Sequence, residues 1–357
     1  MVADVTRDGK YVTPKIDFLT QEGAKKSRPM PKGTLTIVCS GLVGIPSILN
    51  VDSCIHDGFL ALRDISDDCE LEYLYYVFWL LRNKLEVSAT HGGVFTNLTT
   101  EILRELEIKL PPLSEQRSIA KILGTWDQTT ELTQQLLHRK QELKKGIKQQ
   151  LLTGNKRFPE FQQNHWRELK LSDFLELKLR KVLKPEQSYK ALSIRSHGKG
   201  TFSRVVADPK KVAMTHLYEV EKDDLIVNIT FAWEGAIATV KDEDIGCLVS
   251  HRFPTYVFNR TKVLPEYFRH VMTTKRFFHE LGLISPGGAG RNRVLDKNDF
   301  LKIKVLMPDI VEQKRIVDIL QTCDSETDLL FRKLSMLKQQ QKGLLRKLLT
   351  GEIRVKV

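Results

Sequence analysis

The residues with the clearest capacity for chemistry form a glycine-rich stretch that carries two arginines. It runs from Ser285 to Arg293 and reads Ser-Pro-Gly-Gly-Ala-Gly-Arg-Asn-Arg. Glycines let a backbone approach a ligand closely, arginines bind phosphates or the edge of guanine, and asparagine binds the edge of adenine. The stretch is not a phosphate-binding P-loop, because the chain contains no G-x-x-x-x-G-K-S/T. Two interpretations stay open: a DNA contact made by Arg291, Asn292 and Arg293, or a plain turn.

Other polar residues stand in expected loops and at expected strand ends. Lys199 and Arg204 flank a loop, where phosphate contact is favoured over base recognition. Asn228 ends an apolar stretch, and either a base contact or a structural role fits it. His56 and His251 each precede a phenylalanine-containing stretch, so they are either DNA contacts or structural histidines at a strand edge. All five are candidate nucleic-acid contacts.

No arrangement of residues supplies a recognisable catalytic site. The chain lacks H-E-x-x-H, G-x-S-x-G, the zinc deaminase pattern and the Asn/Asp-Pro-Pro-aromatic motif of amino-methyltransferases. Pro308 to Lys314 contains the PD and ExK of nuclease sites, but only two residues separate them. That spacing is too short to span adjacent strands, and a strand end followed by a helix start explains it. We therefore expect no catalytic residue and no metal ligand.

The feature that organises the chain is an internal repeat at an offset of 197 residues. Pro111–Gly154 aligns without a gap with Pro308–Gly351, and 17 of 44 positions are identical. Chance would give about three, so the match marks a duplicated structural unit. The chain of 357 residues is then a repeat of a globular segment followed by a long helix. The globular segments differ much more than the helices, as expected of a fixed scaffold that carries two variable recognition domains.

Each repeated segment predicts a helix of about 38 residues, or about 57 Å. Ser114 is a candidate N-cap, and Gly154 and Gly351 suit left-handed C-caps. Such helices need a partner for their apolar stripe, and the partner is the other copy. Translated copies would give parallel helices, whereas the short polar linker 155–165 favours an antiparallel pair. The expected stripe residues are Ile119, Trp126, Leu136, Leu143, Ile147 and Leu151, then Ile316, Leu330, Leu337 and Leu344.

The globular segments carry both strand and helix patterns. Short apolar stretches bounded by turn residues predict strands, and aromatic-rich segments with helical spacing predict helices whose aromatic residues form core. The expected strands are 34–38, 59–62, 106–111, 224–229, 254–258 and 303–308, and the expected helices are 71–85 and 265–281. The fold class is therefore α+β.

The composition favours a nucleic-acid partner and a reducing compartment. The net charge is +12, and two stretches at the helix C-termini, 139–157 and 332–356, together carry +13. This charge could form a solvated face, contact phosphates or bind an acidic protein. The five cysteines form no C-x-x-C pair, and no run of about 18 apolar residues exists. We therefore expect a cytoplasmic protein without a membrane span.

The repeated motif resembles a known family. Ile108–Leu123 reads I-x-L-P-P-L-S-E-Q-R-x-I-A-x-I-L, and the helix after it ends in L-L-T-G at Leu151–Gly154. A looser copy follows at Val305–Leu320 and Leu348–Gly351. The pattern closely resembles the specificity subunit of type I restriction–modification enzymes, and the likeness covers nearly the whole chain.

The resemblance implies a two-fold design. Two target recognition domains in a pseudo-two-fold arrangement are joined by two long antiparallel coiled-coil helices, and each domain reads one half of a split DNA site. The implied divisions are 1–110 for the first recognition domain, 111–154 for the first spacer helix, 155–307 for the second recognition domain and 308–357 for the second spacer helix.

The resemblance also implies the partners. The subunit would do no chemistry and bind no cofactor. It would bind double-stranded DNA and dock two methyltransferase subunits through the stripe residues of its helices. S-adenosylmethionine, ATP and magnesium are expected on the methyltransferase and motor–nuclease subunits of the complex.

One departure from the family concerns the first domain. The family usually begins with a W-x-x-x-x-L-x-D segment, matched here at Trp166–Asp173 in the second domain only. We therefore expect the first domain to be short at its N-terminus. The alternative function is an assembly scaffold whose truncated first domain does not read DNA.

Overall fold

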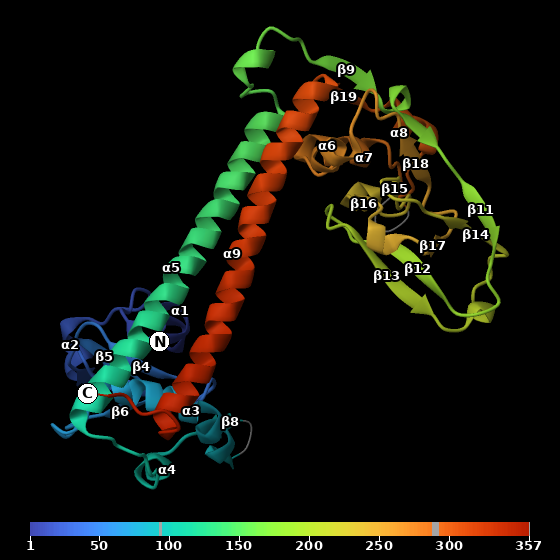
Figure 1. Ribbon diagram of the computed structural model, residues 1–357. Helices are drawn as coiled ribbons and strands as arrows, with labels where there is room; N and C mark the ends of the chain where they lie inside the picture. The colour runs from blue at the N-terminus through green and yellow to red at the C-terminus, as the bar shows by residue number, and fades with distance from the viewer. Residues whose placement is uncertain (93–94, 288–292, 357) are drawn as a thin grey trace. The chain divides into compact units, whose positions relative to one another are not determined.

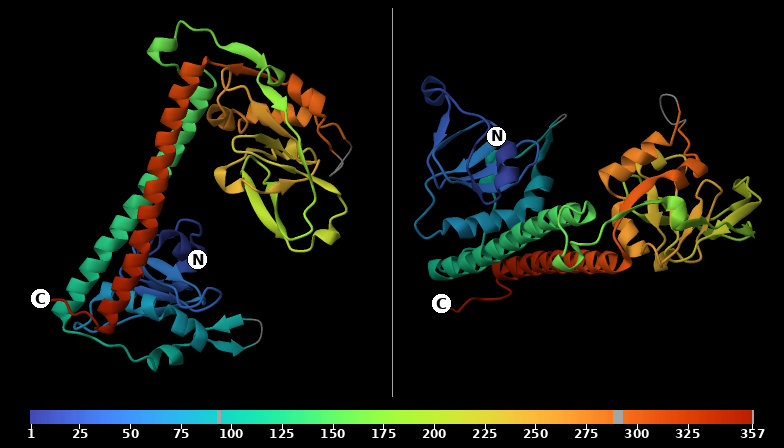
Figure 2. Two further views of the ribbon diagram at one scale, coloured as in Figure 1. Left: turned by 45° about the vertical axis from the view of Figure 1, so that its right-hand side comes forward. Right: turned by 90° about the horizontal axis from the view of Figure 1, so that it is seen from above.

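The computed structural model describes residues 1–92, 95–287 and 293–356. The chain divides into two compact units. Unit 1 comprises residues 1–137 and 329–357, and unit 2 comprises residues 138–328. Two long helices, α5 (Leu113–Leu152) and α9 (Ile310–Thr350), each pass through both units (Figures 1 and 2).

Unit 1 is built on a mixed sheet with the strand order β1-β4-β3-β6, in which only β1 and β4 are parallel neighbours. The strands are β1 (Tyr11–Val12), β2 (Arg28–Met30), β3 (Leu35–Val38), β4 (Pro46–Leu49), β5 (Ser53–Ile55), β6 (Phe59–Leu62), β7 (Thr90–Gly92) and β8 (Phe95–Asn97). The shorter helices are α1 (Val2–Asp8), α2 (Gln21–Lys25), α3 (Leu71–Ser88) and α4 (Thr100–Arg104). Tyr73 and Tyr76 of α3 share one core with Leu123 of α5 and Leu348 of α9, so the long helices help to complete this unit.

Unit 2 contains a four-stranded sheet, β10-β18-β15-β16, and a five-stranded sheet, β11-β14-β17-β12-β13. The strands are β9 (Arg167–Lys170), β10 (Leu175–Leu177), β11 (Arg180–Leu183), β12 (Tyr189–Ile194), β13 (Thr201–Val206), β14 (His216–Glu219), β15 (Leu225–Val227), β16 (Ile237–Thr239), β17 (Leu248–Val249), β18 (Thr255–Phe258) and β19 (Lys304–Met307). The helices are α6 (Pro265–Val271), α7 (Lys275–Leu283) and α8 (Lys297–Lys302), with short 3-10 turns at Pro159–Phe161, Leu171–Asp173, Pro209–Lys211, Ala232–Glu234 and Asp242–Asp244. Phe268 and Tyr256 pack in one core with Leu151 of α5 and Ile316 of α9.

The α+β class is confirmed, and two expectations about single elements are wrong. The helix expected at 265–281 is broken between α6 and α7, where the Thr274 side chain accepts a hydrogen bond from the Phe277 amide and caps α7. Residues 106–111 form no strand, whereas β19 pairs antiparallel with β9. The described part of unit 1 contains no strand equivalent to β9, so residues 106–111 have no partner to pair with.

The two long helices begin and end within two residues of 115–152 and 312–349, the spans that the repeat predicts. Ser114 is the second residue of α5 rather than its N-cap. In the other copy, Asp309 caps α9 by accepting a hydrogen bond from the Glu312 amide at 2.9 Å. Gly154 and Gly351 have φ values of 71° and 77°, which confirms the left-handed turns expected after each helix.

In each unit, α5 and α9 lie side by side and run antiparallel (Figure 1). We call their contact surface in each unit the seam. Polar pairs across the seam are Asp127–Gln341 and Gln134–Lys338 in unit 1, and Lys140–Glu326 and Lys144–Asp324 in unit 2. Residue numbers rise along one helix as they fall along the other in both units, so the antiparallel pairing is confirmed.

Two leucines expected on the apolar stripe face solvent instead. Leu136 is 45% exposed and Leu143 is 55% exposed, whereas Leu137 is 8% exposed. Successive helical residues differ by about 100° around the axis, so burial of Leu137 turns its neighbour outward. The helix buries Thr133 one turn earlier and Thr130 two turns earlier, and apolar periodicity alone could not mark these positions. The other expected stripe residues are buried or half-buried: Ile119, Trp126, Ile147, Leu151, Ile316, Leu330, Leu337 and Leu344.

A buried glutamine at the start of each long helix ties it to its globular segment. The Gln116 amide group donates to the carbonyl oxygens of Asp68 and Pro111, and its oxygen accepts from the Glu70 amide that precedes α3. Gln313 makes the equivalent set of bonds before α6, with Lys262, Pro308 and Leu264. Both glutamines are almost fully buried, so every polar atom of each amide needs such a partner.

A buried glutamate precedes each glutamine and binds an arginine that follows the other helix. In unit 1, Arg354 donates two hydrogen bonds to Glu115, at 2.8 and 2.6 Å. In unit 2, Arg157 donates two to Glu312, at 3.0 and 2.6 Å. Each arginine stands three residues beyond the glycine that ends its helix. We call each pair a Glu–Arg clamp; each joins the start of one long helix to the segment that leaves the other.

The clamp in unit 1 also sets a pH dependence. The hydrogen bonds from Arg354 lower the pKa of Glu115 below its ordinary value. A carboxylate whose pKa is lowered in the folded protein stabilises the fold at pH values above the pKa that it has in the unfolded chain. This stabilisation is lost as the pH falls through the lower pKa of the folded protein.

Replacement of Leu137 by aspartate is expected to lower the free energy of unfolding by at least about 2 kcal/mol, because a charge would be placed in the buried seam. Leu143→Asp is the matched control and should change it by no more than about 0.5 kcal/mol, because Leu143 is exposed. Urea unfolding followed by circular dichroism measures both. Equal losses of unfolding free energy in the two variants would contradict the burial of Leu137 in the seam.

Arg157→Ala is expected to destabilise the protein by about 3 kcal/mol, because the Glu312 side chain, 1% exposed, would lose its cation. Combining it with Glu312→Gln should recover part of this loss, since the buried charge is then removed. Lys156→Ala, at the exposed neighbouring position, is the control. If chemical unfolding gave the same midpoint for Arg157→Ala and Lys156→Ala, the clamp would have no energetic role.

Candidate nucleic-acid interface

A cluster of polar and aromatic side chains forms in unit 2 just beyond the end of β15. Its centre is Thr230, whose amide donates to the Asn228 side-chain oxygen at 3.1 Å. The Trp233 indole donates to the Thr230 carbonyl oxygen at 3.2 Å, and Arg252 donates to the Thr230 hydroxyl at 3.1 Å. Together with Arg293, these residues are called the Thr230 cluster.

Arg293 joins this cluster by stacking on Trp233, with its guanidinium carbon 5.4 Å from the ring centroid. The segment after it is fixed by a backbone hydrogen bond from Leu295 to the Ile229 carbonyl oxygen, at 2.8 Å. Stacking on an aromatic ring restrains the planar guanidinium while its N–H groups stay free to donate. Arg291 and Asn292 lie outside the described residues.

The hairpin of β12 and β13 docks its turn against the same region. His197 and Gly198 donate backbone hydrogen bonds to the carbonyl oxygens of Glu234 and Gly235, at 2.7 and 2.9 Å. The Ser196 hydroxyl donates to the Glu234 carboxylate at 2.8 Å. These bonds hold the hairpin turn beside the loop that carries Trp233.

The remaining sequence candidates lie at different distances from this arrangement. Lys199 is exposed in the docked hairpin turn, and His251 is exposed beside Arg252. Arg204 is exposed on β13, opposite Ala191, and no contact of the described residues joins it to the cluster.

His56, in unit 1, accepts a hydrogen bond from the Gly58 amide at 2.9 Å and meets the Phe59 ring edge-on. His56 therefore stabilises its own turn.

Sequence reasoning missed two basic residues of this region. Arg252 bonds Thr230, and Arg195 stacks on Phe202 with its guanidinium carbon 4.8 Å from the ring centroid. Phe202 is 38% exposed on β13. A phenylalanine at an outward position of a strand, near an arginine, could have revealed Arg195. No sequence signal marks Arg252.

Unit 1 has the same backbone arrangement with different side chains. Leu98 donates to the Cys39 carbonyl oxygen at 2.9 Å, as Leu295 does to Ile229 in unit 2. The loop after β3 reads Ser-Gly-Leu-Val-Gly at 40–44, with Leu42 52% exposed. It has neither the tryptophan nor the arginine of the Thr230 cluster, so the two units present different surfaces from equivalent positions.

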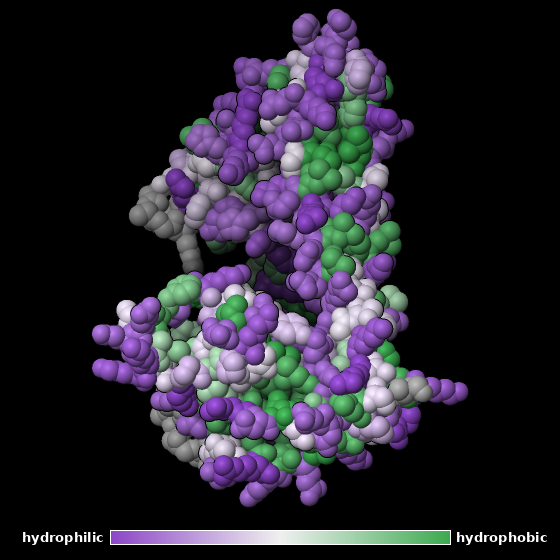
Figure 3. Space-filling model, turned by 90° about the vertical axis from the view of Figure 1, so that its left-hand side faces the viewer, coloured by the Kyte–Doolittle hydropathy of each residue, from purple (hydrophilic) through white to green (hydrophobic). Residues whose placement is uncertain are grey.

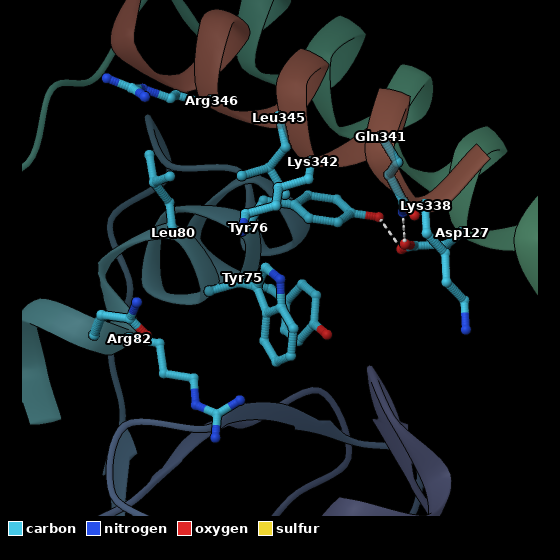
Figure 4. A pocket seen from close by; sticks show the side chains of 12 residues that line it. Tyr75, Tyr76, Leu80, Arg82, Asp127, Lys338, Gln341, Lys342, Leu345 and Arg346 are labelled. Atoms are coloured by element: carbon cyan, nitrogen blue, oxygen red, sulfur yellow. Dashed lines mark hydrogen bonds between the residues drawn. The ribbon is translucent and has the colours of Figure 1, made fainter. Parts of the chain in front are cut away.

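A second polar network in unit 1 lies between α3 and α9 (Figure 4). The Asp127 carboxylate accepts hydrogen bonds from the Tyr76 hydroxyl and the Gln341 amide. Burial raises the pKa of Asp127, and these hydrogen bonds oppose the rise. A hollow of about 540 Å³ opens beside the network. Its basic lining residues are Arg82, Lys338, Lys342 and Arg346. Part of the charge predicted at 332–356 therefore lines a concave surface.

No group of three or more histidine, cysteine, aspartate or glutamate side chains in the described residues could hold a metal ion. No helix in that part of the chain is long and apolar enough to cross a membrane.

Comparison with known proteins places the chain in a class. The model of the type I restriction modification DNA specificity domain matches residues 5–145 and again residues 163–339. The chain therefore belongs to this family, and it is a DNA-binding specificity subunit of the type I restriction–modification class with two target recognition domains.

Particular relatives agree with this class. The chain is 26% identical over 305 residues to the specificity subunit of the type I restriction enzyme MjaVIII of Methanocaldococcus jannaschii, covering 80% of this chain and 70% of that protein. It is 25% identical over 304 residues to the putative MjaX specificity subunit of the same organism, covering 79% and 68%. In fold it is similar to the crystal structure of the type I S subunit from M. genitalium, with a TM-score of 0.56, 18% identity and coverage of 96% and 88%. It is also similar in fold to the crystal structure of the HsdS subunit from Thermoanaerobacter tengcongensis. The TM-score is 0.51 and the sequence identity is 17%, with coverage of 97% of this chain and 87% of that one.

Two glycines of the hairpin turn provide a test of its docking. Gly198 and Gly200 both have positive φ, 64° and 82°, so alanine costs about 1–2 kcal/mol of backbone strain at either. Only at Gly198 would the new methyl group meet Thr273, at 2.7 Å; at Gly200 it meets nothing within 4 Å. We expect Gly198→Ala to lower the melting temperature further than Gly200→Ala and to speed amide hydrogen exchange at residues 230–235. Equal behaviour of the two variants would argue against docking.

Proposed function

We propose that this chain reads a split DNA site, one half with each globular domain, and holds the catalytic subunits of the complex in place. The observation that carries the proposal is the Thr230 cluster. Arg293, stacked on Trp233, presents a restrained two-pronged donor of the kind that binds the O6 and N7 atoms of guanine. Its equivalent place in unit 1 has no arginine, as two half-sites of different sequence require.

The other basic side chains around the cluster suit contacts with the DNA backbone. Lys199 and Arg204 are exposed on the β12–β13 hairpin, and Arg252 and His251 are exposed in the turn before β18. Phosphate contacts of this kind fix the register of a protein on the duplex and carry no sequence information directly. We assign base recognition to Arg293, to its sequence neighbours Arg291 and Asn292, and to Asn228, which belongs to the same Thr230 cluster.

The long helices offer a surface for protein partners. Several large apolar side chains on them are exposed: Leu132, Leu136 and Leu143 on α5, and Leu329, Phe331 and Met336 on α9. Leu132, Leu136 and Leu143 recur at spacings of four and seven and so share one face of α5. Figure 3 shows apolar patches among hydrophilic side chains on the face that it draws. Exposed apolar residues at helical spacing fit the docking of further helices, and we assign them to the two methyltransferase subunits.

The chain is proposed to do no chemistry itself. The residues that resemble a nuclease site are engaged in structure, since Asp309 caps α9 and Glu312 belongs to a Glu–Arg clamp. S-adenosylmethionine, ATP and magnesium belong in this proposal to the methyltransferase and motor–nuclease subunits. The purified chain should therefore neither cleave nor methylate DNA.

The recognition role of Arg293 can be separated from backbone contact by comparing variants in the assembled complex. Arg293→Ala and Arg291→Ala should weaken binding to cognate DNA by about 1–3 kcal/mol and leave binding to scrambled DNA nearly unchanged. Arg204→Ala is the matched control and should weaken both DNAs alike, reducing the salt slope by about one. Affinity is measured by fluorescence anisotropy at several salt concentrations. Uniform loss for Arg293→Ala would reassign it to the backbone.

The split site itself is tested by methylome sequencing of cells that express this chain with its methyltransferase subunits. A bipartite methylated motif separated by a fixed gap is the expected result. A motif with one half only would mean that one globular domain does not read DNA.

A further inference from the structure

One hollow in unit 1 is lined by residues that recur in unit 2. It measures about 410 Å³, within the range of pockets that take ligands, about 300–1,000 Å³. We call it the socket; its lining includes Tyr73, Pro111, Glu115, Ile119, Leu349 and Arg354. Each has an identical counterpart in unit 2, namely Tyr267, Pro308, Glu312, Ile316, Leu152 and Arg157. The same side chains therefore build the same place twice.

In unit 2 the chain itself fills this place. The Trp166 indole donates to the Glu312 carboxylate at 3.2 Å, and the Arg157 guanidinium lies 5.9 Å from the centre of the indole. A Cβ added at Gly154 would lie 3.5 Å from the indole ring. Trp166 is followed directly by β9, which pairs with β19.

In unit 1 the equivalent place is open. A Cβ added at Gly351, the counterpart of Gly154, would meet none of the described atoms within 4 Å. The Arg354 side chain is 66% exposed, whereas that of Arg157 is 16% exposed. The backbone amide of Val355 donates to Oε1 of Glu115 at 3.2 Å, whereas the tryptophan of unit 2 donates to Oε2 of Glu312.

The chain beside the socket, residues 106–110, forms no strand among the described residues. These residues correspond to 303–307, which include β19. The Leu106 amide bonds the Leu103 carbonyl oxygen, whereas no backbone hydrogen bond joins residues 107–110 to another described segment. Backbone without strand partners can pair with an added strand. The Tyr73 hydroxyl bonds the Lys109 carbonyl oxygen at 3.0 Å, and that oxygen keeps a second lone pair for a strand partner.

We propose that the socket binds an extended segment of a partner polypeptide with the pattern W-x-x-L-x-L. The tryptophan enters the socket beside Glu115 and Arg354, and the residues after it pair with 106–110 as an added antiparallel strand. The pattern is that of Trp166, Leu169 and Leu171, the segment that occupies the identical residues in unit 2. This inference does not depend on how either unit reads DNA.

The test uses the full chain and a synthetic peptide of residues 164–175, Asn-His-Trp-Arg-Glu-Leu-Lys-Leu-Ser-Asp-Phe-Leu, labelled with a fluorophore. Saturable binding with one site per chain is expected, because the socket of unit 2 is filled in place. A peptide with the tryptophan replaced by alanine should bind at least about tenfold more weakly, as for a buried aromatic anchor. A photoreactive group at the Arg167 position of the peptide should cross-link to residues 105–115.

Two variants of the protein locate the binding. Arg354→Ala should weaken binding of the peptide several-fold, because the cation beside the indole is lost. Lys356→Ala is the control and should leave the affinity unchanged. Circular dichroism checks that both variants remain folded. Absence of saturable binding, equal affinity of the two peptides, or cross-links confined to unit 2 would overturn the proposal. A dimer of the chain that the peptide dissociates would also overturn it, since the occupant would then be a second copy.

Discussion

The structure depends on two carboxylates that are buried at the starts of the long helices. A buried charge is tolerated only with a partner of opposite sign and good geometry, and each glutamate finds one in an arginine beyond the end of the other helix. The position is the same in both units, because each arginine follows a left-handed glycine by three residues. The neighbouring glutamine then fixes the first turn to the helix that follows the sheet, through α3 in unit 1 and α6 in unit 2. Changes elsewhere in the globular segments leave this framework intact, which allows their exposed loops to differ.

Much of the framework could be predicted from the sequence because the repeat is long and free of gaps. The bounds of α5 and α9 followed from the proline before each and the glycine after each. The seam was harder to predict, since it buries Thr130 and Thr133 and leaves Leu136 outside; threonines that bond the preceding turn of their own helix can be buried without an apolar signal. Arg157 and Arg354 could have been recognised, because they are identical at the repeat offset, but nothing in their local sequence indicates a buried acceptor.

The candidate interface was predictable only in part, for a different reason. Arg293 is 65 positions beyond Asn228 along the chain, and it reaches Trp233 in the loop after Asn228 because Leu295 is hydrogen-bonded to Ile229, just beyond β15. Such a contact depends on tertiary folding, which short motifs do not encode. Arg252 joins the same cluster from a third segment. The sequence pointed instead to its exposed neighbour His251. His56, its apparent counterpart in unit 1, supports a turn, so equal spacing of two histidines did not mean equal use.

The division of the chain has a consequence for the order in which its parts can form during synthesis. Unit 2 is continuous, from 138 to 328, whereas unit 1 is assembled from residues 1–137 and 329–357. Leu345, Leu348 and Leu349 of α9 pack in one core with Tyr73 and Tyr76 of α3, so unit 1 can be completed only after unit 2 has been made. Domains made at about 5–20 residues per second usually fold from the N-terminus onward. Here the core of unit 1 stays incomplete while all of unit 2, residues 138–328, is synthesised.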